Sequence, residues 1–171
     1  MQITVILIVL ASGLALVAML YTIHLLLPGP VEKARSVLES SLGKSFLLGL
    51  INILFAGVIV FLLLRGAQMV RAQGSGGAAI LAGILAVLAF LIVLAVAILV
   101  LNGLVALASL LGTRLYASRP APRGDLWGGL LLVLASLTPY LGWLLFAPAM
   151  ISMGLGATIL SLFQRKPAPV S

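Results

Sequence analysis

Uncharged apolar runs and short charged islands alternate along this chain of 171 residues. The uncharged runs cover residues 1–31, 45–64, 72–113 and 126–164. Each has at least the roughly 20 residues that a helix needs to cross a hydrocarbon core about 30 Å thick. Segments that alternate apolar and polar residues like strands are absent, and a backbone in lipid must satisfy its own hydrogen bonds. The pattern therefore predicts an all-α, polytopic membrane protein.

The first run and the island after it predict one span and one short surface helix. The span covers residues 3–27, because two prolines and a glycine follow it at residues 28–30. In residues 31–43, four apolar residues share one helical face: Val31, Ala34, Leu38 and Leu42. Three charged residues lie largely on the opposite face: Glu32, Arg35 and Glu39. We expect this amphipathic helix to lie in the membrane interface and to end at Gly43.

The second and third runs predict two further spans. Residues 46–64 form one span, and a Gly- and Ser-rich turn at residues 73–77 follows it. The third run would be about 50 Å long as one straight helix, far more than one crossing requires. We expect a span at residues 79–101 with an apolar extension to residue 116, which must lie along the interface or against a partner. The only candidate break is Asn102 followed by Gly103, which would add a helix.

The fourth run would be nearly 60 Å long as one helix and contains its own break. A helix breaker, a permissive glycine and two interfacial aromatics predict a tight turn at the membrane surface: Pro139, Tyr140, Gly142 and Trp143. We expect a short transmembrane or re-entrant leg at residues 126–138 and a last span at residues 143–163. Pro148 should kink this span, and residues 164–171 form a tail.

The number of Lys and Arg residues on each side of the membrane distinguishes these topologies. Five helices with the N-terminus outside place eight of the ten basic residues on the cytoplasmic side. Six helices place seven of the ten basic residues on the cytoplasmic side. Four helices, with one crossing in each run, place six there. The positive-inside rule favours five spans within a range of four to six, with the N-terminus outside and the C-terminus cytoplasmic.

The composition supports a membrane protein and excludes several function classes. Hydrophobic residues make up 63% of the chain and charged residues 8%, compared with about 25% charged in soluble domains. The net charge of +7 comes from basic residues that flank spans, so we expect anionic lipid rather than nucleic acid as their partner. With no cysteine, disulfides, thiolate catalysis and cysteine-ligated metals are excluded.

Few side chains are suited to chemistry, which argues against an enzyme or a coupled transporter. The three acids, Glu32, Glu39 and Asp125, all lie outside the expected spans, where they cannot couple ion movement. His24 is the one candidate cofactor ligand, since a single histidine on a membrane helix can hold the magnesium of a chlorophyll-type pigment. A hydrogen-bonded interfacial histidine near Tyr21 is the alternative.

Small and amide residues within the spans predict close helix packing. Small residues recur at four-residue spacing, which lets helices approach closely, and two asparagines within hydrocarbon should bond to other helices. The packing candidates are Ala79, Gly83, Asn52, Asn102, Gly112, Ser152, Gly154 and Gly156. A compact bundle or a partner interface is therefore the expected use of these helices.

Three stretches also resemble a known family: residues 30–50, residues 137–143, and residues 154–157 with the sequence Gly-Leu-Gly-Ala. Together they resemble the small multi-helix bacterial membrane domain that is often fused to bactofilin-like, polymer-forming β-helical domains. The resemblance implies an inner-membrane module without known catalysis, suited to anchoring or assembly. The sequence departs from that pattern in having no β-helical part and no Gly and Pro pattern after Leu64.

These observations predict a non-catalytic accessory, assembly or scaffold subunit of a larger complex in the bacterial inner membrane. Its partners would be the lipid bilayer and other membrane subunits, or further copies of the same chain. A channel or carrier for a small solute or lipid is the alternative, and a pigment-binding accessory subunit that uses His24 is a second one. No cofactor beyond bound lipid is expected.

Overall fold

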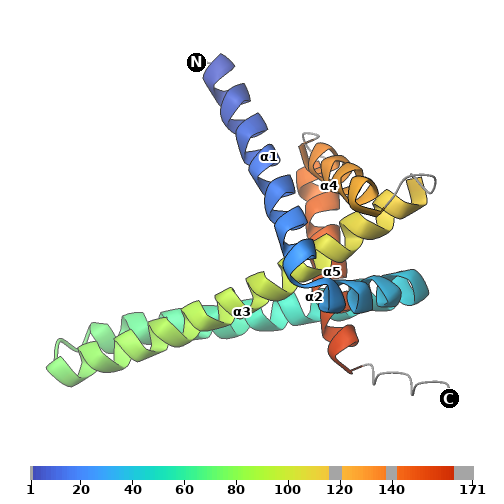
Figure 1. Ribbon diagram of the computed structural model, residues 1–171. Helices are drawn as coiled ribbons and strands as arrows, with labels where there is room; N and C mark the ends of the chain where they lie inside the picture. The colour runs from blue at the N-terminus through green and yellow to red at the C-terminus, as the bar shows by residue number, and fades with distance from the viewer. Residues whose placement is uncertain (1, 116–120, 138–141, 164–171) are drawn as a thin grey trace.

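The computed structural model describes residues 2–115, 121–137 and 142–163, and these form helices joined by short connections (Figure 1). No strand occurs in these ranges, so the expectation of an all-α protein is confirmed. Three helical stretches are long and apolar enough to cross a membrane: Pro28–Arg71, Gly76–Leu115 and Leu144–Phe163. A shorter apolar helix covers Ala11–Leu26. The protein therefore has the helices of an integral membrane protein.

The helices follow in the order α1 (Gln2–Leu26), α2 (Pro28–Arg71), α3 (Gly76–Leu115), α4 (Ala121–Leu137), the π-helical turn η1 (Gly142–Phe146) and α5 (Ala147–Phe163). Two boundaries considered in the sequence analysis have different outcomes in the structure. The amphipathic segment and the span after it both belong to α2, and α3 passes through Asn102 and Gly103 as one helix.

A kink at Ser41 divides α2 into two segments that run in different directions. The backbone of Ser41 leaves the helical region at φ −156° and ψ 61°, two residues before the helix end that Gly43 predicts. Serine hydroxyls bond to the carbonyls around the break: Ser40 and Ser41 donate to Val37 O, and Ser45 donates to Ser41 O. Such bonds let the helix bend while its carbonyl groups stay paired.

Residues 53–71 of α2 and 76–98 of α3 form an antiparallel pair that projects from the rest of the molecule (Figure 1), and we call this pair the hairpin. Its turn uses Gly74 at φ 71°, a conformation that glycine adopts readily. The few buried residues of the hairpin are all alanines: Ala67, Ala78, Ala82 and Ala89. Because the seam between the two helices is so narrow, their large apolar side chains point outward.

The other helical parts pack together where α1, α4 and α5 meet residues 28–52 of α2 and the end of α3, and we call this part the body. Val31, Ala34 and Leu38 are fully buried in its core, together with residues 105–108 of α3. Three of the four apolar residues of the amphipathic segment are thus covered by helices of the same chain, whereas Leu42 is 38% exposed. The apolar extension of the third run is covered in the same way at residues 103–112, whereas Leu115 is exposed.

The π-helical turn η1 directly precedes α5 and lies next to Pro148. A proline ring clashes with the carbonyl four residues earlier, which here belongs to Leu144 within η1. A wider turn at this point relieves the clash, since π-turns are a common irregularity within helices. The kink expected at Pro148 stays a prediction, and the irregularity that the structure shows is this π-turn, which ends two residues before the proline.

Candidate functional site

A close contact between helices lies where α5 crosses α2. Gly49 is packed against the carbonyl of Ser152, and Gly156 is packed against the carbonyl of Ser45. A Cβ atom on either glycine would overlap the facing carbonyl oxygen, so only glycine fits at both positions. Each helix contributes a serine and a glycine four residues apart, and the two pairs meet in opposite order. This reciprocal contact, the Ser–Gly clamp, joins the kinked helix to the last helix.

A second close contact joins α5 to α3. Gly103 lies against the backbone of Gly154, where a Cβ would again overlap main-chain atoms. Next to it, the hydroxyl of Thr158 lies 3.0 Å from Leu99 O on α3 and 3.0 Å from Gly154 O on its own helix. Because Thr158 is buried, its contact with Leu99 fixes the two helices relative to each other at the base of the hairpin.

A third close contact brings α4 onto the end of α3. Gly128 is buried against the carbonyl of Ala108 and the amide nitrogen of Gly112. Ala108 and Gly112 are spaced four residues apart and so face α4 together. All three close contacts lie in the body, and together they tie α2, α3, α4 and α5 into one unit.

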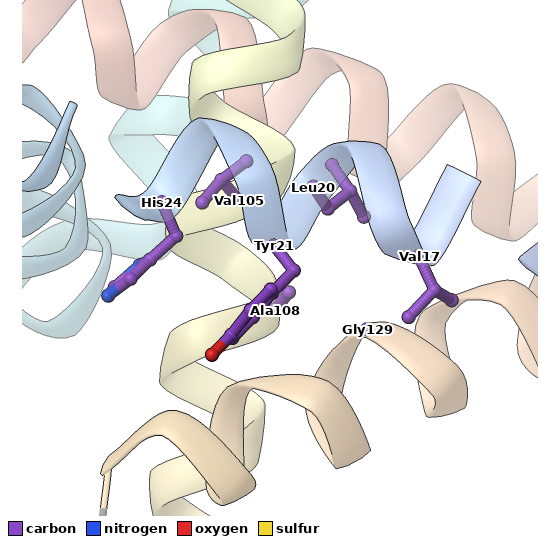
Figure 2. Close-up of a pocket in the computed structure, with 7 residues that line it drawn as sticks. All are labelled: Val17, Leu20, Tyr21, His24, Val105, Ala108 and Gly129. Atoms are coloured by element: carbon purple, nitrogen blue, oxygen red, sulfur yellow. The ribbon is translucent and has the colours of Figure 1, made fainter. Parts of the chain in front are cut away.

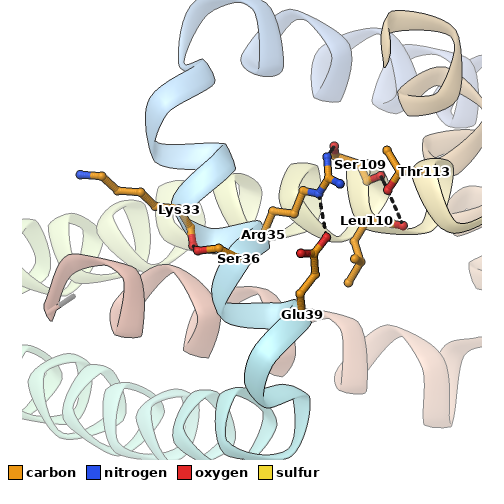
Figure 3. Close-up of polar contacts among 7 residues, drawn as sticks. All are labelled: Lys33, Arg35, Ser36, Glu39, Ser109, Leu110 and Thr113. Carbon is orange, nitrogen blue, oxygen red and sulfur yellow. Dashed lines mark hydrogen bonds and ion pairs between the residues drawn. The ribbon is translucent and has the colours of Figure 1, made fainter. Parts of the chain in front are cut away.

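A polar cluster on the first segment of α2 faces the end of α3 (Figure 3). The Nε of Arg35 donates to Glu39 Oε1 at 3.1 Å, and its Nη1 donates to Ser109 Oγ at 3.4 Å. Ser109 is almost fully buried, whereas the side chain of Arg35 is 23% exposed. The guanidinium therefore bridges a buried hydroxyl and a carboxylate nearer the surface.

His24 lies beside a small cavity between α1, α3 and α4 (Figure 2). The cavity has a volume of about 10 Å³ and is lined mainly by apolar residues, among them Val17, Leu20 and Val105. This is room for about one water molecule. Figure 2 shows His24 and Tyr21 extending from the same side of α1. Among the described residues, the cavity beside this histidine is too small to enclose a pigment, and pigment binding by His24 stays a prediction.

The other predicted packing residues are placed differently from the glycines of the body. The Nδ2 groups of Asn52 and Asn102 donate to Leu48 O and Ile98 O, each four residues earlier in its own helix. The Oδ1 of Asn102 is buried and has no hydrogen-bond partner among the described residues. Ala79 and Gly83 lie exposed on the hairpin, and a Cβ at Gly83 would meet nothing within 4 Å. Gly112, Ser152, Gly154 and Gly156 are the predicted residues that the structure brings into close contacts.

The predicted surface turn falls mostly in a part of the chain that is not described. Pro139 and Tyr140 lie outside the described residues, whereas Gly142 is buried in η1 and Trp143 belongs to the same turn. The turn divides α4 from the last helix, as the break in the fourth run predicts. Its position relative to a membrane surface remains a prediction.

Within the described ranges, no three residues among His, Cys, Asp and Glu come close enough to hold a metal ion. The features that dominate are instead the glycine contacts of the body and the open apolar surface of the hairpin. Sequence reasoning missed Ser45, Gly49, Gly103 and Gly128 as contact residues. The spacing of Ser45 and Gly49 was a usable signal, because it is the same four-residue pattern that identified Ser152 and Gly156.

Comparisons with protein-family models, with curated proteins and with solved structures found no match to this chain.

Proposed function

We propose that this protein is a non-catalytic scaffold subunit of a larger complex in the bacterial inner membrane. In this proposal the body is a rigid junction of helices, and the hairpin is an apolar arm that contacts lipid and other subunits. The glycine contacts support the first part, because they need one fixed arrangement of four helices. The resemblance to an anchoring module of bacteria agrees with the second part.

The observation that carries the proposal is the open surface of the hairpin. In the most apolar 18-residue windows of α2 and α3, only 6% of the residues are buried, compared with 39% in the last helix. Large apolar residues project on both hairpin helices, among them Phe55, Phe61 and Phe90. Exposed apolar surface of this extent marks a lipid or protein contact.

The proposal includes five spans, with the N-terminus outside and the C-terminus in the cytoplasm. The contact of Arg35 with Ser109 supports it, because it brings the first charged island next to the helix end that carries Arg114. Both then lie at the body end of the molecule, whereas Arg65 and Arg71 lie toward the tip of the hairpin. Placing the body end inside follows the excess of basic residues there.

Site-specific photocrosslinking in native membranes tests the scaffold role. A photoreactive residue replaces Phe90, which is 64% exposed, and a matched control replaces Leu155, which is 1% exposed. We expect the probe at position 90 to form adducts with one or a few defined membrane proteins, which co-purify at fixed stoichiometry in mild detergent. The control should give none. Adducts with lipid only, together with a monomeric protein in native membranes, would contradict the proposal.

A further inference from the structure

The tip of the hairpin carries an open groove of about 410 Å³ between α2 and α3. Four residues of each helix line it: Leu64, Ala67, Gln68 and Arg71 on α2, and Ala79, Ala82, Gly83 and Ala86 on α3. Each set follows the spacing i, i+3, i+4, i+7, which places its members on one face of a helix. The groove is therefore a continuous channel along the hairpin, about 10 Å long for seven residues of helix.

The two ends of the groove differ in chemistry. Because the helices are antiparallel, Arg71 and Ala79 mark the end at the turn, and Leu64 and Ala86 mark the end toward the body. The floor consists of alanines and Gly83, which leave room for a guest because their side chains are short. The turn end adds the guanidinium of Arg71 and the amide of Gln68. The groove thus has a cationic, hydrogen-bonding end at the turn and an apolar part toward the body.

The charge of Arg71 at the turn end of the groove is not balanced by acidic residues of the hairpin. The acids of the chain are Glu32 and Glu39 in the first segment of α2 and Asp125 in α4. The second cation of the region, Arg65, has its guanidinium carbon 5.5 Å from the centre of the Phe61 ring and does not line the groove. Arg71 is therefore the cation that faces a guest in the groove.

We propose that this groove binds one acyl chain and the phosphate of an anionic phospholipid. Guanidinium groups bind phosphate oxygens through paired, charge-assisted hydrogen bonds, and the amide of Gln68 adds a further donor. The residues that line the rest of the groove offer an acyl chain only apolar contact. Arg71 lies at the turn end of the groove, away from the body, which is the end nearest the lipid headgroups when the hairpin crosses a bilayer.

A second copy of the chain is the rival occupant, because Ala79 and Gly83 have the spacing of a helix-pairing surface. A two-fold axis along the membrane normal would bring the Arg71 side chains of both copies to the same end of the interface. Like charges would then face each other without an acid between them. An anionic headgroup removes this conflict. The site requires the hairpin to lie in a bilayer, but it does not depend on the scaffold role.

The test uses the full chain in phosphatidylcholine vesicles with spin-labelled phosphatidylglycerol or spin-labelled phosphatidylcholine as probes. The fraction of motionally restricted label reports binding of each lipid. We expect about fivefold preference for phosphatidylglycerol, the factor typical of one cation at an anionic surface. Arg71→Gln should reduce the preference to about one. Arg65→Gln removes the same charge outside the groove and should keep at least half of the preference.

Gly83→Leu tests the acyl channel separately, since open space surrounds this position and the larger side chain would fill the groove without disturbing the hairpin. We expect it to lower the restricted fraction of phosphatidylglycerol, with an unchanged midpoint of thermal unfolding. An excess of glycerol phosphate should not displace the labelled lipid, because it has no acyl chain. Equal losses for both arginine variants, displacement by glycerol phosphate, or an unchanged restricted fraction of phosphatidylglycerol in Gly83→Leu would each overturn the proposal. A self-association that Gly83→Leu abolishes would assign the groove to a second copy instead.

Discussion

The two ends of α3 are similarly apolar in sequence but are covered very differently. In the hairpin, Ile80 is 69% exposed and Phe90 is 64% exposed, and the buried positions are alanines. In the body, Val105 is 3% exposed and Leu110 is 4% exposed, and residues 105–110 are buried without interruption. The hairpin residues contact one neighbouring helix, whereas the body residues lie among four others.

This difference shows what decides burial within a membrane helix. Lipid solvates apolar side chains as well as protein does, so hydrophobicity alone does not bring helices together. Close packing requires small residues at the crossing points. The body has glycines at its crossings with α4 and α5, and the hairpin glycines Gly57 and Gly83 have open space around them. The comparison predicts that matched substitutions cost much more stability in the body than in the hairpin.

The largest effect is expected for a glycine of the Ser–Gly clamp. Gly156→Leu places a side chain where even a Cβ overlaps Ser45 O, so α5 and α2 must separate. We expect a loss of more than about 3 kcal/mol in the free energy of unfolding, the upper end for overpacked interiors. Gly57→Leu in the hairpin is the control and should change it by less than about 0.5 kcal/mol. Titration with denaturing detergent, followed by tryptophan fluorescence, measures both, and equal effects would remove the distinction between the regions.

A smaller effect is expected when a large side chain is truncated. Leu38→Ala leaves a cavity in the core of the body, where Leu38 is fully buried, and should cost about 2 kcal/mol. Leu62→Ala in the hairpin removes a side chain that is 61% exposed, so lipid can fill the space. The unfolding titration should show almost no change for Leu62→Ala. A cost at Leu62 close to that at Leu38 would indicate that protein, not lipid, covers the hairpin in the purified state.

A third comparison concerns hydrogen bonds at the base of the hairpin. Thr158→Val removes the hydroxyl that contacts Leu99 O on another helix, and should cost about 0.6 to 1 kcal/mol. Asn52→Leu removes an amide that bonds within its own helix, and should be nearly neutral. The same unfolding titration checks both variants. If Asn52→Leu costs more than Thr158→Val, the amide has a partner on another helix in the membrane.

The smallest effect is expected for the Arg35–Glu39 pair. Both side chains reach solvent, and pairs with this spacing on an exposed helix contribute about 0.3 to 0.5 kcal/mol. Glu39→Gln should lower the unfolding free energy by that amount at low ionic strength and by less at high salt. Glu32→Gln on the same helix is the control. A cost at Glu39 that does not depend on salt would point to a different source of stability.

The helical class, the long apolar helices and several contact residues could be predicted from sequence. Uncharged runs identify helices that must satisfy their backbone bonds internally, and four-residue spacing identified Ser152 and Gly156 as contact residues. The same spacing at Ala79 and Gly83 marks an open groove instead. Spacing shows that a helix can approach closely, but the partner is decided by the fold as a whole.

Two features of the fold lay beyond sequence reasoning for physical reasons. The apolar extension after Asn102 had no visible partner, because its cover comes from helices distant in sequence, among them α4 and the first segment of α2. The kink of α2 falls at Ser41 rather than at Gly43, since serine hydroxyls can bond to the carbonyls that a bend exposes. Neither the glycine content nor the hydropathy of a segment indicates where such hydrogen bonds form.

The continuity of α3 through Asn102 and Gly103 has a mechanical consequence. A single helix runs from the turn of the hairpin to the contact of Gly103 with Gly154, a lever about 40 Å long. A rotation of about 5° at that contact would move the tip by about 3.5 Å, more than half of one helical turn. A small change in how α5 packs on α3 would thus be amplified into a larger displacement at the tip of the hairpin.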